Sequence, residues 1–319
     1  MNTKTHSIHI EGLEHRFGDK VALSDINWQL PEKGIVGLVG PNGAGKTTLF
    51  SLIAGFLRVQ RGKIGILGAD SPNHPSLVGR MGVMPQDAIF AKDISIFDQL
   101  LFLMKLDGIN GTRAENRALE IMKRVGLEKE IHRGASILSH GMGKRLGVAQ
   151  ALLGSPEIVL LDEPTAGLDP ANARQIREFM REVGKNALVI VSSHNLLELQ
   201  DLIDEVGVIV AGKLVASGTV EEVTQRDRRF EVTFGVPVTP EMLVQVDQLD
   251  GVQSANYDGF QMSIDLDASG ENGLNQALLE LQQKLVDLGT PAYELREGAS
   301  LEQAYLKLTS DTQHTSEEG

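Results

Sequence analysis

The stretch GIVGLVGPNGAGKTTLF (residues 34–50) determines the fold class of this chain. An apolar run is followed by GPNGAGKT (40–47), which satisfies the pattern G-x-x-x-x-G-K-[ST], and then by a segment with helical character. A glycine-rich loop between a strand and a helix lets successive backbone N–H groups surround phosphate oxygens, helped by the partial positive charge of the helix N-terminus. The loop therefore predicts binding of a nucleoside triphosphate. Lys46 is expected to reach the β- and γ-phosphates, and the hydroxyl of Thr47 to ligate Mg²⁺.

A second nucleotide-facing element is expected at IVLLDEP (158–164), where an apolar strand ends in two acids. Asp162 is suited to hold the water shell of a magnesium ion, and Glu163 to orient or deprotonate an attacking water. Taken alone, adjacent acids after a strand fit a solvated loop equally well. The phosphate loop upstream favours the catalytic interpretation.

Short β-rich runs alternate with helical patterns up to about residue 224, which predicts an α/β domain with a largely parallel sheet. Strands are expected at 34–40, 63–68, 158–162, 188–193 and 206–212. The pattern predicts a domain over 1–224 with a helical insert at about 87–154. After a polar linker, residues 225–310 follow the order βαββαβ, which is the ferredoxin-like arrangement, and a disordered tail is expected at 311–319.

Composition limits the classes of function. The 319 residues suit about two domains. The formal net charge of -13 argues against nucleic acid as a partner, because phosphate binding needs clustered Lys and Arg. There is no cysteine, and neither a signal peptide nor a run of about 18 apolar residues is evident. We therefore expect a soluble chain without direct membrane insertion.

Five motifs occur in a fixed order: GPNGAGKTT, MPQ (84–86), LSHGM (138–142), LLDEPTAGLDP (161–170) and SSH (192–194). Because of these motifs and their order, the chain resembles the nucleotide-binding subunit of ABC transporters. The resemblance covers residues 8 to about 224. Related ATPases that do not transport carry a long coiled coil or two cassettes, whereas this chain has one cassette and no sustained heptads. The resemblance implies a Mg²⁺-dependent ATPase with the P-loop ABC cassette fold and a helical subdomain.

The resemblance also implies roles for residues that would be weak candidates alone. Gln86 would sense magnesium and the attacking water, His194 would contact the γ-phosphate, and Asp169 would cross to a partner subunit. Phe17 would stack on adenine. The alternatives are a solvated loop for Gln86, a structural histidine for His194, an N-cap of the following helix for Asp169 and a core position for Phe17.

The complete set of expected site residues follows from these motifs. The catalytic residues are Glu163, His194, Lys46 and Gln86; the nucleotide-binding residues are Phe17, Asn42, Gly43, Gly45, Lys46, Thr47, Thr48, Ser139, Gly141 and Asp169; the metal-binding residues are Thr47, Gln86 and Asp162. The implied cofactors are ATP and Mg²⁺.

The signature LSHGM departs from the family's usual LSGGQ at His140 and Met142. Its chemistry needs a serine hydroxyl and backbone N–H groups at a helix N-terminus, and Ser139 and Gly141 are retained. We interpret it as a working variant, similar to the LSxGM form of exporters with ABC-2 type permeases. SLEQAYLKLT (300–309) resembles the ending of the same subfamily.

The family resemblance further implies an assembly. Phosphate loop and signature face different nucleotides, so hydrolysis is expected in a head-to-tail homodimer. This homodimer would power a separately encoded ABC-2 type permease from the cytoplasmic face of the membrane, and the subfamily resemblance implies an exporter. For the C-terminal domain, dimerisation or regulation is expected.

Overall fold

The computed structural model describes residues 6–193, 199–224, 228–266, 271–290, 292–297 and 305. The chain divides into two compact units, Met1–Thr219 and Val220–Gly319. This division lies just before the boundary expected after residue 224. Each unit has an apolar core of its own.

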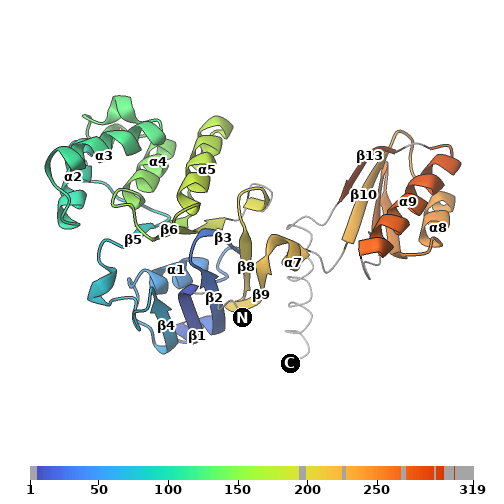
Figure 1. Ribbon diagram of the computed structural model, residues 1–319, viewed down its shortest axis with the longest axis horizontal. Helices are drawn as coiled ribbons and strands as arrows, with labels where there is room; N and C mark the ends of the chain where they lie inside the picture. Colours follow the sequence, from blue (N-terminus) through green and yellow to red (C-terminus); the bar gives the residue numbers. More distant parts are fainter. Residues whose placement is uncertain are drawn as a thin grey trace. The chain divides into compact units, whose positions relative to one another are not determined.

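The first unit is built on a six-stranded sheet (Figure 1). Its order is β5 (Met81–Met84), β6 (Ile158–Asp162), β7 (Leu188–Ser193), β3 (Gly34–Val39), β8 (Glu205–Val210) and β9 (Lys213–Thr219). The first five strands are parallel, and β9 runs antiparallel to β8. Because the carboxyl ends of neighbouring parallel strands share one edge, the segments that follow β5, β6, β7 and β3 all leave the sheet at that edge.

A separate antiparallel sheet has the order β2 (Lys20–Pro31), β1 (His6–Phe17) and β4 (Arg61–Ile66). The strand expected at 63–68 is β4, but it pairs with β1 and is not part of the parallel sheet. Strands β1 and β2 were not expected from the sequence, because their buried residues alternate with polar ones, as in strands with one solvated face. Helix α1 (Lys46–Ile53) packs its apolar residues into the core shared by the two sheets (Figure 1).

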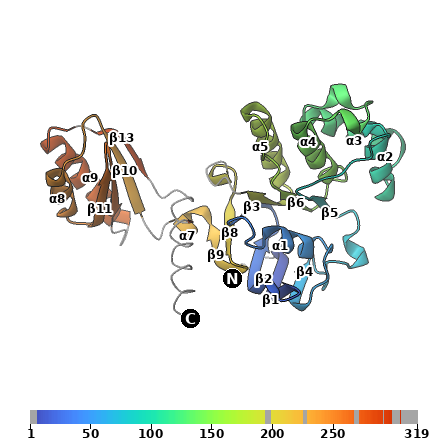
Figure 2. The same ribbon diagram turned by 180° about the vertical axis from the view of Figure 1, so that it is seen from behind.

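Three helices lie between β5 and β6 in the sequence: α2 (Ile96–Leu106), α3 (Gly111–Arg124) and α4 (His140–Ala151). They form a group of their own beside the sheet (Figure 2). Helix α5 (Pro170–Gly184) packs on β3 and β7, and a Cβ atom at Gly184 would lie 2.7 Å from the Ile35 side chain. The edge of the sheet at which β5 ends is therefore followed in sequence by this group of helices.

The second unit begins with the short helix α7 (Val220–Thr224). It continues with β10 (Arg228–Phe234), α8 (Pro240–Asp247), β11 (Val252–Asp258), β12 (Gln261–Leu266), α9 (Glu271–Asp287) and β13 (Ala292–Glu297). The strands form one antiparallel sheet of order β11-β12-β10-β13. This is the ferredoxin-like βαββαβ arrangement that the sequence predicts. The expected tail, 311–319, lies outside the described residues.

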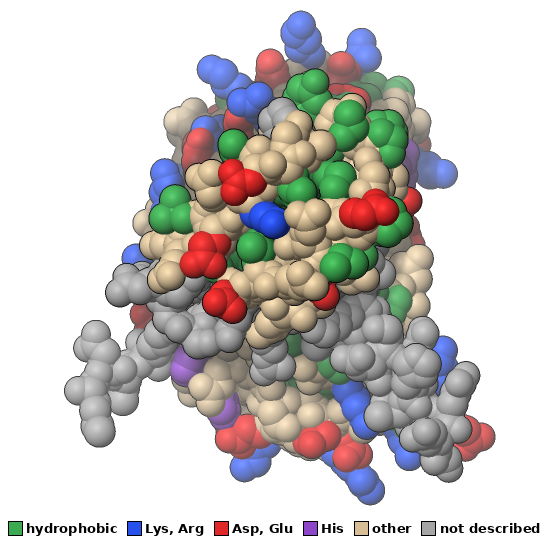
Figure 3. Space-filling model, turned by 90° about the vertical axis from the view of Figure 1, so that its right-hand side faces the viewer, with side chains coloured by type: hydrophobic (Ala, Val, Ile, Leu, Met, Phe, Trp, Pro, Cys, Tyr) green, Lys and Arg blue, Asp and Glu red, His purple; other side chains and the backbone are tan. Residues whose placement is uncertain are grey.

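The two units differ in charge. Of the chain's 30 Lys and Arg residues only 6 lie beyond Thr219, whereas 19 of its 43 Asp and Glu residues do. The formal charge of -13 therefore belongs to the second unit, and the first is formally neutral. Figure 3 views the second unit from the side of α8 and α9, where acidic and apolar side chains are spread over the surface and basic ones are sparse.

Candidate functional site

The phosphate loop connects β3 to α1 and is shaped by two glycines with positive φ. Gly43 has φ 78° and Gly45 has φ 111°. A Cβ atom at Gly45 would lie 2.7 Å from the Leu23 side chain and 2.8 Å from the Ala22 carbonyl, so this position requires glycine. Asn42 and Gly43 are exposed at the outer side of the loop, and Thr48 lies in the first turn of α1.

Lys46 starts α1 and is buried, with 7% of its surface exposed. Its Nζ donates to the carbonyl oxygens of Gly40 (2.6 Å) and Pro41 (3.1 Å), so the loop curls around the ammonium group. Burial lowers the pKa of Lys46, and the carboxylates of Glu163 and Asp162 oppose that shift. The loop thus holds a partly desolvated cation, which a bound anion would stabilise.

Asp162 ends β6 and is the centre of a hydrogen-bond network. The Thr47 hydroxyl donates to its Oδ2 (2.9 Å), and the Ser192 hydroxyl donates to its Oδ1. Asp162 is directly opposite Ser192 in the register of β6 and β7. Ser192 was missed by the sequence analysis, although its place in SSH, one residue from the end of a buried strand, is a usable signal.

The oxygens of Thr47 and Asp162 fit a magnesium ion. Mg²⁺ prefers oxygen ligands in an octahedron at about 2.1 Å, which puts neighbouring ligands about 3 Å apart. The observed separation of 2.9 Å between Thr47 Oγ1 and Asp162 Oδ2 is close to that value. Among the described residues no group of three His, Asp or Glu side chains could hold a metal.

Glu163 follows Asp162 in a left-handed backbone conformation, with φ 55°. Such a φ is uncommon for a residue with a side chain and marks local strain. The Glu163 N–H donates to Ser192 Oγ (3.0 Å), and the residue is 8% exposed. Ser192 therefore fixes both the carboxylate of Asp162 and the backbone of Glu163. Of the residues expected at the site, the structure brings together Lys46, Thr47, Asp162 and Glu163.

Gln86 is exposed in the segment that follows β5. Its backbone carbonyl accepts a hydrogen bond from Lys144 Nζ (2.7 Å), a residue of α4 that the sequence analysis did not single out. His194 lies outside the described residues; β7, which precedes it, ends at Ser193 on the same edge of the sheet as Asp162.

The signature residues begin α4. Ser139 is the N-cap, and its hydroxyl accepts from the Met142 N–H (3.2 Å). The start of α4 packs closely against the turn that precedes α5. A Cβ atom added at Gly141 would lie 3.2 Å from the Leu168 side chain, and one added at Gly167 would lie 3.3 Å from the His140 ring. The His140 and Met142 replacements are therefore accommodated with the helix N-terminus formed.

Asp169 is the N-cap of α5, as the alternative interpretation of this residue expects. Its carboxylate accepts from the Asn172 N–H (3.0 Å) and from the Asn172 side chain, and these bonds lower the pKa of Asp169. Pro170 occupies the first turn. A role across a subunit boundary remains a prediction.

Phe17, at the end of β1, is 52% exposed, so the core alternative does not hold. Its ring packs edge to face on the buried His15, with the centroids 4.7 Å apart. The neighbouring strand β2 contacts the phosphate loop through Ala22 and Leu23. An exposed aromatic ring at this end of the hairpin fits a base-stacking position.

Comparison with known proteins identifies the family. Residues 23–166 match the ABC transporter family. The bacitracin transport ATP-binding protein BcrA of Bacillus licheniformis is 34% identical over 221 residues, covering 68% of this chain and 71% of that protein. The chain belongs to the ABC transporter family. The daunorubicin resistance ATP-binding protein DrrA3 of Streptomyces coeruleorubidus is also 34% identical, covering 68% of this chain and 69% of that protein.

Some relatives of this ABC transporter ATP-binding subunit extend over the second unit. The linearmycin resistance ATP-binding protein LnrL of Bacillus subtilis is 27% identical and covers 96% of this chain and 99% of that protein. A solved ATP-binding subunit of an ABC transporter aligns with a TM-score of 0.65 at 24% identity, over 70% of this chain and 93% of its own, and shows the cassette fold. Within the described residues, no helix combines the length and apolar character needed to span a bilayer.

Proposed function

We propose that this ABC transporter ATP-binding subunit is a Mg²⁺-dependent ATPase that closes as a head-to-tail homodimer and powers a separately encoded ABC-2 type permease, an exporter, from the cytoplasmic face of the membrane. The single observation that carries the catalytic part is the network around Asp162, which joins the phosphate-loop hydroxyl of Thr47 to the backbone of Glu163 through Ser192.

In this proposal the phosphate loop and Lys46 bind the triphosphate, and Lys46 offsets the charge that develops on the γ-phosphate. Thr47, Asp162 and Gln86 would hold Mg²⁺, which would neutralise charge on the phosphate oxygens of the triphosphate. Glu163 accepts the proton of the attacking water, and Gln86 and His194 orient that water. The fixed backbone of Glu163 supports this assignment, because a general base must be held within hydrogen-bond reach of the proton it removes.

The dimer is needed because the signature acts in trans. In the proposal Ser139 and the N–H groups at the start of α4 bind the γ-phosphate held by the other copy, and Asp169 lies at the same boundary. The support is the N-terminal geometry of α4, whose first-turn N–H groups and dipole suit an anion. On binding nucleotide, the Ser139 hydroxyl would exchange its bond from Met142 for one to phosphate.

The permease partner is supported by the names of the relatives and by an apolar surface. BcrA is named for bacitracin transport, and DrrA3 and LnrL for resistance to daunorubicin and linearmycin. Between residues 87 and 106, four large apolar side chains are exposed: Ile89 (93%), Ile94 (49%), Phe102 (61%) and Leu106 (64%). Contiguous exposed apolar patches mark interaction sites, and these four residues are the candidates for such a patch. We propose that this segment contacts the permease.

The test measures the mass of Glu163→Gln protein by size exclusion with light scattering, with and without ATP and Mg²⁺. This variant should bind ATP without hydrolysing it and shift from monomer to dimer when both are added. Ser139→Ala in the same background should remove most of the shift, because the signature would no longer complete the site. Steady-state hydrolysis by Glu163→Gln should fall at least about a hundredfold.

Two results would count against the proposal. Wild-type turnover by Glu163→Gln would remove Glu163 as the base. If the molecular mass of Glu163→Gln did not change when ATP and Mg²⁺ were added, nucleotide-driven closure would be contradicted. A dimer both with and without ATP would assign dimerisation to the second unit. Lys46→Ala serves as the control that binds phosphate poorly.

A further inference from the structure

Lys144 is a buried cation that the proposed mechanism does not use. It lies in the second turn of α4, is 7% exposed, and donates from Nζ to the backbone carbonyl of Gln86 (2.7 Å). A buried ammonium group costs free energy unless it is hydrogen-bonded, and surface lysines are far more common. The burial of Lys144 therefore indicates a specific role. Its acceptor belongs to the segment between β5 and α2.

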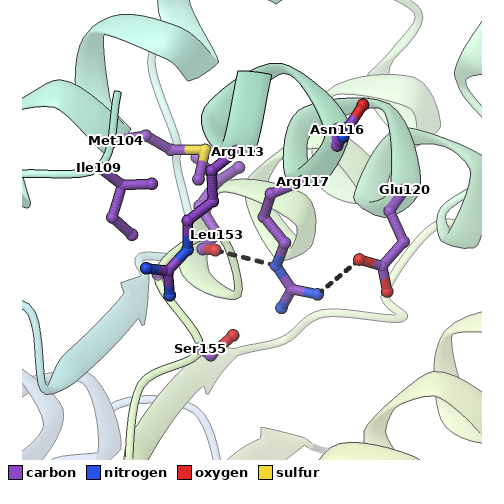
Figure 4. Close-up of a pocket in the computed structure, with 9 residues that line it drawn as sticks. Met104, Ile109, Arg113, Asn116, Arg117, Glu120, Leu153 and Ser155 are labelled. Atoms are coloured by element: carbon purple, nitrogen blue, oxygen red, sulfur yellow. Dashed lines mark hydrogen bonds and ion pairs between the residues drawn. The ribbon is translucent and has the colours of Figure 1, made fainter. Parts of the chain in front are cut away.

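Other side chains hold α4 to α3. Arg145 donates to the carbonyls of Val125 and Gly126 (2.9 and 3.0 Å), just after the end of α3. From α3, Arg117 donates to the carbonyls of Leu152 and Leu153 (3.1 Å each), at the end of α4, and also pairs with Glu120 (Figure 4). These bonds satisfy carbonyls left open at the helix ends and make α3 and α4 one body.

Lys144 makes a different connection, because its acceptor follows β5. Around it the backbones are in close contact. A Cβ atom at Gly147 would lie 3.1 Å from the Met84 side chain, and one at Gly82 would lie 1.8 Å from the Ala151 carbonyl oxygen. Small residues at these places let β5 and the Gln86 segment lie directly on α4. Lys144 then ties the backbone of Gln86 to the helix whose first turn carries the signature.

We propose that Lys144 is a positioning residue, which sets the place of Gln86 relative to the signature helix so that the water-orienting amide and the phosphate-binding helix start move together. The inference rests on the proposed ATPase function. It assigns no contact between Lys144 and the nucleotide. Loss of the ammonium group would leave the phosphate loop intact and misplace Gln86.

The experiment is a double-mutant cycle of Lys144→Met and Gln86→Ala in the full chain, with steady-state ATP hydrolysis and binding of a fluorescent ATP analogue measured below the unfolding temperature. Methionine keeps the buried stem and removes the donor. Lys144→Met should lower kcat about tenfold, while KM and the Kd of the analogue change less than about twofold. In the Gln86→Ala background the same substitution should lower kcat no further, because the residue it positions is gone.

Two controls separate positioning from general destabilisation. Lys144→Arg keeps a donor at the helix and should retain at least about half of the wild-type kcat. Lys123→Met, on the exposed side of α3, should change nothing. Wild-type kcat in Lys144→Met, or additive losses in the double variant, would overturn the inference. Failure of the proposed function would be recognised separately, since wild-type protein would then hydrolyse no more ATP than Lys46→Ala.

Discussion

The interiors of the two units differ in chemistry. In the first unit, four charged residues are buried near the edge at which the parallel strands end: Lys46, Lys144, Asp162 and Glu163. In the second unit, the buried residues of the described part are apolar apart from Thr224, which precedes the βαββαβ fold. Buried charges cost free energy and are retained where they are paired or needed for chemistry. The residues expected to act in catalysis therefore lie in the first unit, whereas the second is held together by apolar packing.

The two units also differ in formal net charge, and here the charge belongs to the second unit. The first unit is formally neutral, whereas the second carries the chain's charge of -13. Like charges on two such units repel each other, so close association of two copies through this unit alone would be opposed at low ionic strength. This observation favours regulation over dimerisation among the two roles expected for the second unit.

The strongest test of the comparison is Lys46→Ala. Removing the buried cation should lower kcat for ATP by about a thousandfold, because a positioned charge at the transferring phosphoryl group is lost. Steady-state phosphate release measures this. Lys63→Ala, an exposed lysine on β4, is the matched control and should leave kcat unchanged. A loss below about tenfold in Lys46→Ala would mean that the buried charge is not catalytic.

The second test introduces a cavity in the other unit. Leu281 in α9 is fully buried, so Leu281→Ala should destabilise the second unit by about 3 kcal/mol. Denaturant unfolding followed by circular dichroism should show this loss while kcat for ATP stays within about twofold. Leu279→Ala, on the same helix and 66% exposed, is the control. If kcat fell in proportion to stability, the units would be coupled and the contrast would fail.

Much of both units follows from sequence because it depends on local pattern. The strand, glycine loop and helix around Lys46 are one contiguous signal, and the order of elements after residue 228 predicts the ferredoxin-like fold. The antiparallel sheet was missed because its strands alternate polar and apolar residues, and because β4 pairs with β1 across about 50 residues.

The sequence predicts which residues form the candidate site better than it predicts the contacts between them. Asp162 and Glu163 were found from the acids after a buried strand. Ser192, which links them, depends on the register between β6 and β7, and Lys144 on the packing of α4 against the segment after β5. The place of Ser192 in SSH marks it only weakly, and a lysine in a helix carries no local pattern that distinguishes it. Only the fold brings them to their partners.

The smallest expected effect is a pH dependence of ATP binding that comes from Lys46. Burial lowers the pKa of this ammonium group in the free protein, and the phosphates of ATP would raise it again by favouring the charged form. At pH values between the two pKa values, binding must take up a proton, so affinity should fall by a few-fold as pH rises through this window and stay constant below it. The phosphates of ATP titrate at about pH 6, so the measurements belong above that pH.

Calorimetry at a series of pH values above neutrality, in two buffers with different ionisation enthalpies, would measure this uptake as a fraction of one proton. Lys46→Arg is the control, because arginine stays charged throughout and should abolish the uptake whatever its affinity.

The same pKa shift makes folding of the free protein less favourable below the lowered pKa and more favourable as pH rises above it, since the unfolded chain then binds more protons. Nucleotide affinity and free-protein stability should therefore change in opposite directions over one pH window. The C-terminal unit, with no buried lysine among its described residues, provides no such group. Proton release on binding, or equal uptake in Lys46→Arg, would show that the linked group is another one and would remove Lys46 as the source of the contrast.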